Sequence, residues 1–132
     1  MNFASTRLTV ADIKTMVGFY EMVTGARADW LAPVFAEIVT PNATLAFNAA
    51  ETVAVFKEGI AEPAANRSAT LEFRVADVDA EFARLKDKAE VVFEPKTMPW
   101  GNRCAQFRDP EGTLVALFAP VTEAAKARFG QR

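Results

Sequence analysis

The 132-residue chain is predicted to be an α+β protein, made of two βαβββ modules in tandem. Two observations support this fold class. Residues 10–13 (VADI) recur as residues 75–78 (VADV), and each copy follows a stretch in which apolar and polar residues alternate. Alternation with a period of two is typical of a half-buried strand, and internal repetition indicates a duplicated structural unit.

In the first module, residues 6–10 alternate and predict the opening strand. Asp12 is placed to cap a helix whose apolar residues recur at helical spacing as far as Val23. Gly25 is a suitable stop for that helix. Three more strands are predicted at residues 34–40, 44–47 and 52–56, with a hairpin turn at residues 48–51.

The second module repeats this order. Residues 70–75 alternate as a strand, and Asp77 is placed as the cap of a shorter helix. Lys86 and Lys88 near its end suit the negative end of the helix dipole. Strands are predicted at residues 91–93, 104–107 and 113–118, with a turn at residues 109–112 (DPEG).

The predicted organisation is a single domain over residues 1–132. Module one covers residues 3–58, a linker covers 59–67, module two covers 68–119, and a C-terminal helix occupies 120–132. The linker is predicted from its Gly, Pro and Asn residues, which favour turns and loops.

Charge and composition exclude several classes of partner. The net charge of −2 gives no basic surface for nucleic acid or for an anionic membrane. No apolar run approaches the roughly 20 residues of a membrane span, and the N-terminus lacks a signal-peptide pattern. Cys104 is the only cysteine, so no internal disulfide can form. We therefore expect a cytoplasmic protein that binds neither nucleic acid nor membrane.

Three short motifs carry a resemblance to a known family. They are residues 75–78 (VADV), 99–103 (PWGNR) and 107–112 (FRDPEG), in this order within a duplicated βαβββ chain. The chain resembles the vicinal oxygen chelate superfamily over about residues 3–119. That group includes glyoxalase I, the bleomycin resistance proteins and the extradiol dioxygenases. The resemblance implies mixed β-sheets that curve around a cavity, with the helices on the outer face.

The resemblance also locates four positions for metal ligands. Enzymes of this family hold a divalent metal with His, Gln or Glu on the first and last strand of each module. The matching positions in this chain are Ser5, Ala54, Thr70 and Ala116. Alanine has no ligating side chain, hydroxyls are poor ligands for transition metals, and the chain contains no His. We therefore expect no metal site, no other cofactor and no catalytic residue.

Strand alternation places further side chains in the implied cavity. If Ser5 and Thr70 face it, then Arg7 and Glu72 lie on the same side of their strands. The predicted ligand-binding residues are Arg7, Trp30, Phe56, Thr70, Glu72, Trp100 and Arg103.

Other roles are open for several of these residues. Arg7 and Glu72 are equally able to pair with each other across the pseudo-twofold axis. Trp30 and Trp100 serve loop packing or a dimer contact as well as they serve an aromatic wall. A salt bridge at the rim suits Arg103 better than an anionic ligand does.

We expect a metal-free protein that binds a small aromatic or amphipathic molecule, like the drug-sequestering members that give antibiotic resistance. Binding of this kind needs no metal ligand, general base or nucleophile. The alternatives are a glyoxalase-like lyase, isomerase or dioxygenase with a non-standard site, and a degenerate module that only dimerises or regulates a partner. The resemblance further implies a homodimer.

Overall fold

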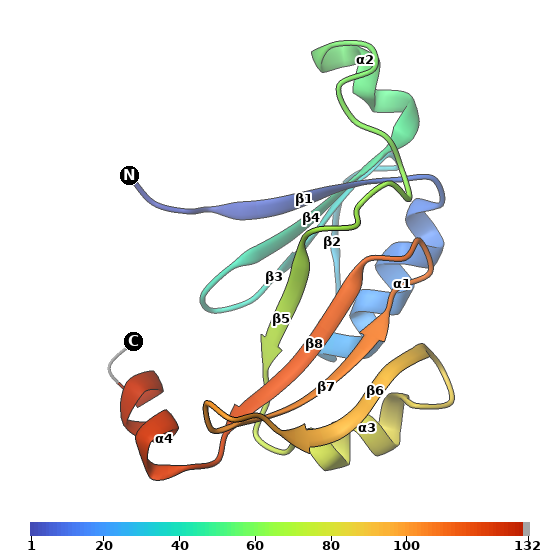
Figure 1. Cartoon of the computed structure of the whole chain (residues 1–132). Helices are drawn as coiled ribbons and strands as arrows, with labels where there is room; N and C mark the ends of the chain where they lie inside the picture. The colour runs from blue at the N-terminus through green and yellow to red at the C-terminus, as the bar shows by residue number, and fades with distance from the viewer. Residues whose placement is uncertain (131–132) are drawn as a thin grey trace. The chain divides into compact units, whose positions relative to one another are not determined.

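The computed structural model describes residues 1–130, which form two compact units. The first unit is Met1–Asn66 together with Pro110–Gly112, and the second is Arg67–Asp109 together with the chain from Thr113. Each unit contains one mixed four-stranded sheet with a helix against it (Figure 1). The predicted α+β class and the tandem repeat are therefore confirmed. Within residues 1–130, no helix is long and apolar enough to span a membrane.

The elements of the first unit follow the order of the chain. They are β1 (Ser5–Val10), α1 (Ile13–Thr24), β2 (Asp29–Ala32), β3 (Phe35–Val39), β4 (Thr44–Ala49), the 3-10 turn η1 (Ala50–Thr52) and α2 (Val53–Phe56). The sheet order is β1-β4-β3-β2, with β1 parallel to β4 and the other pairs antiparallel.

The core of the first unit lies between α1 and the sheet. Met16, Val17 and Tyr20 recur at helical spacing and are buried on one face of α1. The Tyr20 ring lies 5.5 Å from the ring of Phe47 on β4, measured between centroids. The face of the sheet that carries Phe47 is thus the face that α1 covers.

The two predicted helix caps are confirmed. The Asp12 carboxylate accepts a hydrogen bond from the Thr15 backbone N–H at 3.1 Å, and the Asp77 carboxylate accepts one from the Ala80 N–H at 3.1 Å. Each aspartate satisfies a donor that the first helical turn leaves unpaired. The hydrogen bonds from Thr15 lower the pKa of Asp12, because they stabilise its ionised form.

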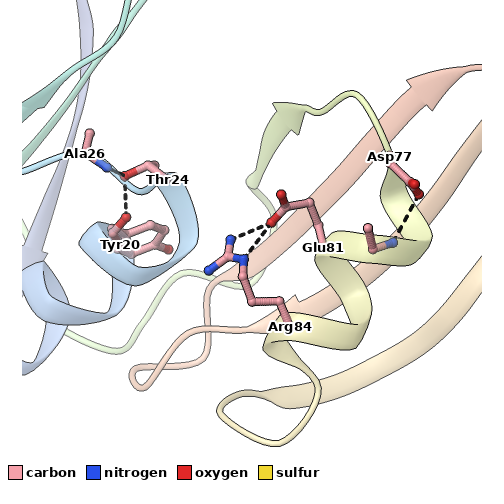
Figure 2. A network of polar contacts seen from close by, with 7 residues as sticks. Tyr20, Thr24, Ala26, Asp77, Glu81 and Arg84 are labelled. Carbon is pink, nitrogen blue, oxygen red and sulfur yellow. Dashed lines mark hydrogen bonds and ion pairs between the residues drawn. The ribbon is translucent and has the colours of Figure 1, made fainter.

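Polar contacts also stabilise the later turns of the helices (Figure 2). At the end of α1, the Thr24 hydroxyl donates to the Tyr20 carbonyl at 2.7 Å and accepts from the Ala26 N–H at 3.1 Å. In the second unit, the Arg84 Nε donates to the Glu81 carboxylate at 2.9 Å, one turn away on α3. This exposed pair has the spacing that supports an isolated helix modestly.

The prediction of a strand at residues 52–56 was wrong. That segment is the end of η1 followed by α2, and the turn predicted at residues 48–51 is the end of β4 and the start of η1. A short apolar run such as TVAVF suits a helix as well as a strand. The missing strand of the first module is β2, which sequence analysis did not identify. The hairpin turn follows β3 instead, where the Thr40 N–H donates to the Ala43 carbonyl at 3.0 Å.

The second unit repeats the fold of the first. Its elements are β5 (Thr70–Arg74), α3 (Val78–Leu85), β6 (Glu90–Thr97), β7 (Asn102–Arg108), β8 (Leu114–Pro120) and α4 (Glu123–Gly130). The sheet order is β5-β8-β7-β6, with β5 parallel to β8, so the pairing pattern of the first sheet recurs. The four predicted strands are confirmed with changed bounds: β5 ends one residue earlier than predicted, β6 and β7 are longer at both ends, and β8 begins one residue later and ends two residues later.

A C-terminal helix was predicted at residues 120–132, and the structure has α4 there from Glu123, after β8, which still includes Pro120 (Figure 1). Gln131 and Arg132, also within that prediction, lie outside the described residues. The Thr122 hydroxyl oxygen accepts a hydrogen bond from the Ala125 N–H at 3.2 Å and so caps the helix.

The turn at residues 109–112 is confirmed and has a second role. It closes with a hydrogen bond from the Asp109 N–H to the Thr113 carbonyl at 2.9 Å. The carboxylate of Glu111 accepts hydrogen bonds from the backbone N–H groups of Ala11 and Asp12, at 2.9 to 3.1 Å. Glu111 therefore anchors the segment that leads into α1.

Candidate functional site

The strand register of the second sheet separates its two faces. Phe107 and Val115 are opposite each other on β7 and β8, are fully buried and share the face that α3 covers. The Phe82 ring of α3 stacks 5.5 Å from the Phe107 ring. Because strand side chains alternate, Asn102 of β7 and Phe118 of β8 point to the other face. We call this other face, which also carries Glu72 of β5, the pocket face.

A pocket of about 410 Å³ lies on the pocket face. Its size falls within the roughly 300–1,000 Å³ that is usual for small-molecule sites. The lining residues come from β5, the turn before β7, β7, β8 and α4: Glu72, Trp100, Asn102, Phe118, Arg128 and Phe129.

Aromatic rings form most of the apolar lining. The ring of Phe118 lies 5.3 Å from the ring of Phe129, so α4 attaches to the sheet through an aromatic contact. Trp100 is 58% exposed, which leaves much of its indole accessible. The guanidinium of Arg128 lies over the Phe129 ring at 4.5 Å, and that of Arg74 lies at 5.6 Å. Cation–π contacts of this kind help to hold Phe129 at the pocket.

Asn102 is the buried polar group of the pocket. Asn102 is the first residue of β7 and is only 6% exposed. Among residues 1–130, no group donates a hydrogen bond to its side-chain oxygen Oδ1. Buried acceptors have a hydrogen-bond partner in the large majority of cases, so this unpaired oxygen is an exception and is a position where a ligand donor could bind.

The turn at Gly101 positions both sides of the pocket. The Gly101 carbonyl accepts hydrogen bonds from the N–H groups of Val121 at 2.9 Å and Thr122 at 3.3 Å. These bonds attach the start of α4 to the turn that carries Trp100. Gly101 has a φ of +94°, and a Cβ at this position would lie 2.1 Å from the Thr122 hydroxyl oxygen. Glycine is therefore needed where α4 meets the turn.

Two of the predicted ligand-binding residues line this pocket, Glu72 and Trp100. Thr70 lies two residues before Glu72 on the same face of β5 but does not line the pocket. Glu72 has no ion pair among the described residues of the second unit.

Arg103 points to the other side of β7. Its Nε and Nη2 atoms donate to the Asp79 carboxylate of α3 at 2.6 and 2.8 Å. This bidentate contact lowers the pKa of Asp79 and raises that of Arg103, because each charge favours the other. The salt-bridge role is thus the one that the structure gives to Arg103.

The remaining predicted residues belong to the first unit. The Arg7 guanidinium lies 4.4 Å from the centre of the Phe56 ring, which brings these two predicted residues together. Trp30 pairs with Ala36, whose neighbour on β4 is Phe47. Trp30 therefore lies on the face that α1 covers, although it is 44% exposed.

The register also corrects one of the four metal-ligand positions. In the second sheet Ala116 lies beside Glu72, and the matching pair in the first sheet is Ala46 beside Arg7. Ala54 was assigned to this position on the strand predicted at residues 52–56, but it is an exposed residue of α2. The counterpart of Ala116 is therefore Ala46.

The residues at these positions do not fit the metal of the family. The first unit offers Ser5 and Ala46, and the second offers Thr70 and Ala116. Two methyl groups and two neutral hydroxyls cannot replace imidazole and carboxylate ligands. Within residues 1–130, no group of three or more His, Cys, Asp or Glu side chains is arranged to hold a metal ion.

Cys104 lies on the pocket face but has the character of a core residue. It is only 9% exposed, and burial raises the pKa of its thiol, with a further contribution from the charge of Glu72. A raised thiol pKa disfavours the reactive thiolate.

Sequence analysis missed Asn102, Arg128 and Phe129 as pocket residues. Asn102 belongs to the PWGNR motif, directly before Arg103, and this motif is the sequence feature that points to it. Arg128 and Phe129 reach the pocket only because α4 attaches to the Gly101 turn, and no pattern in the sequence indicates that contact.

Comparisons with known proteins point to one family. A model of the Glyoxalase/Bleomycin resistance protein/Dioxygenase superfamily matches residues 2–117. An uncharacterised Bacillus subtilis protein, YraH, is 30% identical over 127 residues, which is 89% of this chain and 98% of that protein.

Solved structures agree in fold. A glyoxalase/bleomycin resistance protein/dioxygenase from Nocardioides has a TM-score of 0.77 at 23% identity, over 93% of this chain and 85% of that one. A family enzyme from Burkholderia phytofirmans has a TM-score of 0.74 at 22% identity, over 89% of this chain and 98% of that one. At this level of identity the likeness concerns the fold alone.

Proposed function

We propose that this chain, which belongs to the Glyoxalase/Bleomycin resistance protein/Dioxygenase superfamily, binds a small flat organic molecule without a metal. The proposed site is the pocket of the second unit. The observation that carries the proposal is a buried acceptor, Asn102 Oδ1, in a pocket that is also lined by three aromatic rings and by the charged residues Glu72 and Arg128. Ligand sites commonly combine an apolar lining with a few polar anchors of this kind.

Binding is favoured over catalysis by the chemistry of the side chains present. The family's ligand positions hold hydroxyls and methyl groups, and the chain contains no His to act as a general base. The thiol of Cys104 has a raised pKa, which is the wrong direction for a nucleophile. No residue of the pocket pairs with a second group as a nucleophile and its base do.

A protein that binds without turning over its ligand can protect a cell by sequestration. We extend the proposal to this role, with an antibiotic or a reactive aromatic metabolite as the class of ligand. Sequestration requires one bound molecule for each site and unchanged ligand after release. We also propose that the protein works as a homodimer, which sedimentation at micromolar concentration tests: a species of 14.4 kDa would contradict the dimer.

Fluorescence of the two tryptophans tests the location of the site. In Trp30→Phe the only remaining indole is Trp100 of the pocket, and in the matched variant Trp100→Phe it is Trp30 on the α1 side of the first sheet. We expect a panel of flat aromatic antibiotics and metabolites to contain compounds that quench Trp30→Phe saturably and leave Trp100→Phe unchanged. Equal quenching of both variants, or of neither, would contradict the proposed site.

A second measurement separates binding from catalysis. Ligand recovered after incubation with equimolar protein should be chemically unchanged, with or without added Mn²⁺, Ni²⁺ or Zn²⁺. Metal-dependent conversion of the ligand would overturn the metal-free proposal and favour an enzyme of the glyoxalase or dioxygenase type.

A further inference from the structure

We infer that the pocket selects flat aromatic ligands that donate an N–H hydrogen bond, such as aromatic amines and amidine-like heterocycles, over aromatic anions. This inference rests on the proposed function, because it names the class of ligand for the same site. Its basis is the arrangement of one buried acceptor, one carboxylate and three aromatic rings around the pocket.

The sheet side of the pocket carries two acceptors, Asn102 Oδ1 and the Glu72 carboxylate, beside the amide N–H groups of Asn102. Asn102 Oδ1 has no donor among residues 1–130, and the carboxylate of Glu72 has no ion pair among the described residues of the second unit. Both side chains come from the same face of the sheet, on β7 and β5. A ligand with adjacent N–H groups can donate to both acceptors, whereas a ligand that carries only acceptors leaves both unpaired.

The burial of Asn102 determines how strongly the pocket prefers ligands with N–H donors. A hydrogen bond to a group that is only 6% exposed forms in a low local dielectric and is not screened by salt. A ligand without a donor covers the acceptor and offers no replacement, which is the costly case for a buried polar group. A ligand with an N–H donor therefore gains the hydrogen bond and also avoids the cost of leaving the buried acceptor unpaired.

The aromatic residues set the shape of the ligand. Trp100, Phe118 and Phe129 offer ring faces and edges to a flat molecule. The face of the Trp100 ring can also attract a protonated heterocycle, whereas the Phe129 ring already lies against the guanidinium groups of Arg74 and Arg128.

Arg74 of β5 lies near the pocket, with its guanidinium 5.6 Å from the Phe129 ring, and the lining group that favours an anion is Arg128. It lies on the last turn of α4, is exposed, and already stacks on the Phe129 ring at 4.5 Å. An exposed charge is screened by water and salt, so its attraction for an anionic ligand is small. The buried acceptor therefore outweighs Arg128 in the choice of ligand.

The experiment uses three bicyclic probes of similar size in isothermal titration calorimetry. 1-Aminoisoquinoline carries the N–H donors, isoquinoline is the same ring system without the amino group, and 2-naphthoate is the aromatic anion. We expect 1-aminoisoquinoline to bind about tenfold more tightly than isoquinoline, as the gain of one buried hydrogen bond implies. We expect 2-naphthoate to bind most weakly.

Two variants assign the selectivity to the acceptors. Asn102→Leu keeps the approximate shape and removes the acceptor. It should weaken 1-aminoisoquinoline and tighten isoquinoline, because no acceptor is then covered without a donor, so the tenfold preference should disappear. Glu72→Gln removes an exposed charge, so it should fold normally and weaken only the amino compound, by less than Asn102→Leu does because an exposed charge is screened. The matched control is Glu90→Gln, at the far end of the sheet opposite Arg108, which should change neither affinity.

The outcomes separate the two proposals. Equal affinities for 1-aminoisoquinoline and isoquinoline, or tightest binding of 2-naphthoate, would overturn the donor selectivity and leave the pocket as a binding site. Binding of the amino compound that neither Asn102→Leu nor Glu72→Gln weakens would also overturn it. Binding of none of the three probes up to their solubility limits would overturn both proposals.

Discussion

Replacement of Gly101 by alanine tests whether the Gly101 turn builds the pocket. The residue has a φ of +94°, and an added Cβ would lie 2.1 Å from the Thr122 hydroxyl oxygen and 3.0 Å from the Ala125 Cβ. A left-handed conformation costs an alanine about 1–2 kcal/mol. Overpacking against the start of α4 adds about 1–3 kcal/mol. The substitution should therefore lower the free energy of unfolding by about 2–5 kcal/mol.

The melting temperature reports this change. For 132 residues the entropy of unfolding is about 0.28 kcal/mol per kelvin, so a loss of about 3 kcal/mol lowers the melting temperature by about 11 °C. The matched control is Gly59→Ala, because Gly59 has a φ of +79° but nothing within 4 Å of an added Cβ. The control carries only the backbone strain of about 1–2 kcal/mol.

Ligand binding gives the second readout. The Cβ added by Gly101→Ala can fit only if the Thr122 side chain, which caps α4, or the start of α4 itself moves, and α4 carries Arg128 and Phe129 of the pocket. We expect Gly101→Ala to weaken the best ligand from the tryptophan titrations at least about tenfold at a temperature where the variant is fully folded, and Gly59→Ala to leave its affinity unchanged. A Gly101→Ala protein as stable and as competent in binding as Gly59→Ala would refute this reasoning.

Three more predictions concern the supports of the fold and the pocket. Glu111→Gln should lower the free energy of unfolding by about 1–2 kcal/mol in urea denaturation, because a neutral amide is a weaker acceptor for the Ala11 N–H than a carboxylate. An unchanged midpoint would show that the hydrogen bonds of Glu111 do not stabilise the fold. Asp79→Asn should lower the melting temperature at pH 7, and the difference from the unchanged protein should shrink as the pH falls below about 4. Arg103 depresses the pKa of Asp79, so the ion pair stops contributing to stability only when the carboxylate takes up a proton. A difference in melting temperature that is independent of pH would contradict this. Phe129→Ala should weaken the ligand about tenfold or more by removing one aromatic wall, and unchanged affinity would show that α4 takes no part in binding.

The repeat in the sequence predicted the fold well because it fixes strands and caps locally. The alternating residues before Asp12 and Asp77, and the carboxylates that cap the helices, need only nearby partners. The segment at residues 52–56 was misassigned because its apolar run has no decisive period. β2 was missed because it is only four residues long and mostly exposed.

The site was harder to predict than the fold. Glu72 and Trp100 were identified from strand alternation and from an unusual aromatic in a loop. Asn102 is important because its side-chain oxygen is buried and accepts no hydrogen bond from residues 1–130. That burial arises from tertiary packing and leaves no local pattern in the sequence. Arg103 shares the same motif but turns to Asp79, because adjacent residues of a strand point to opposite faces.

The most direct test of the account is a crystal structure of the protein with 1-aminoisoquinoline bound. We predict that the bicyclic ring lies against Trp100 and Phe118, with a ligand nitrogen about 2.7–3.2 Å from Asn102 Oδ1. A ligand bound away from this pocket, or one whose nitrogens all point away from Asn102, would contradict the central claim.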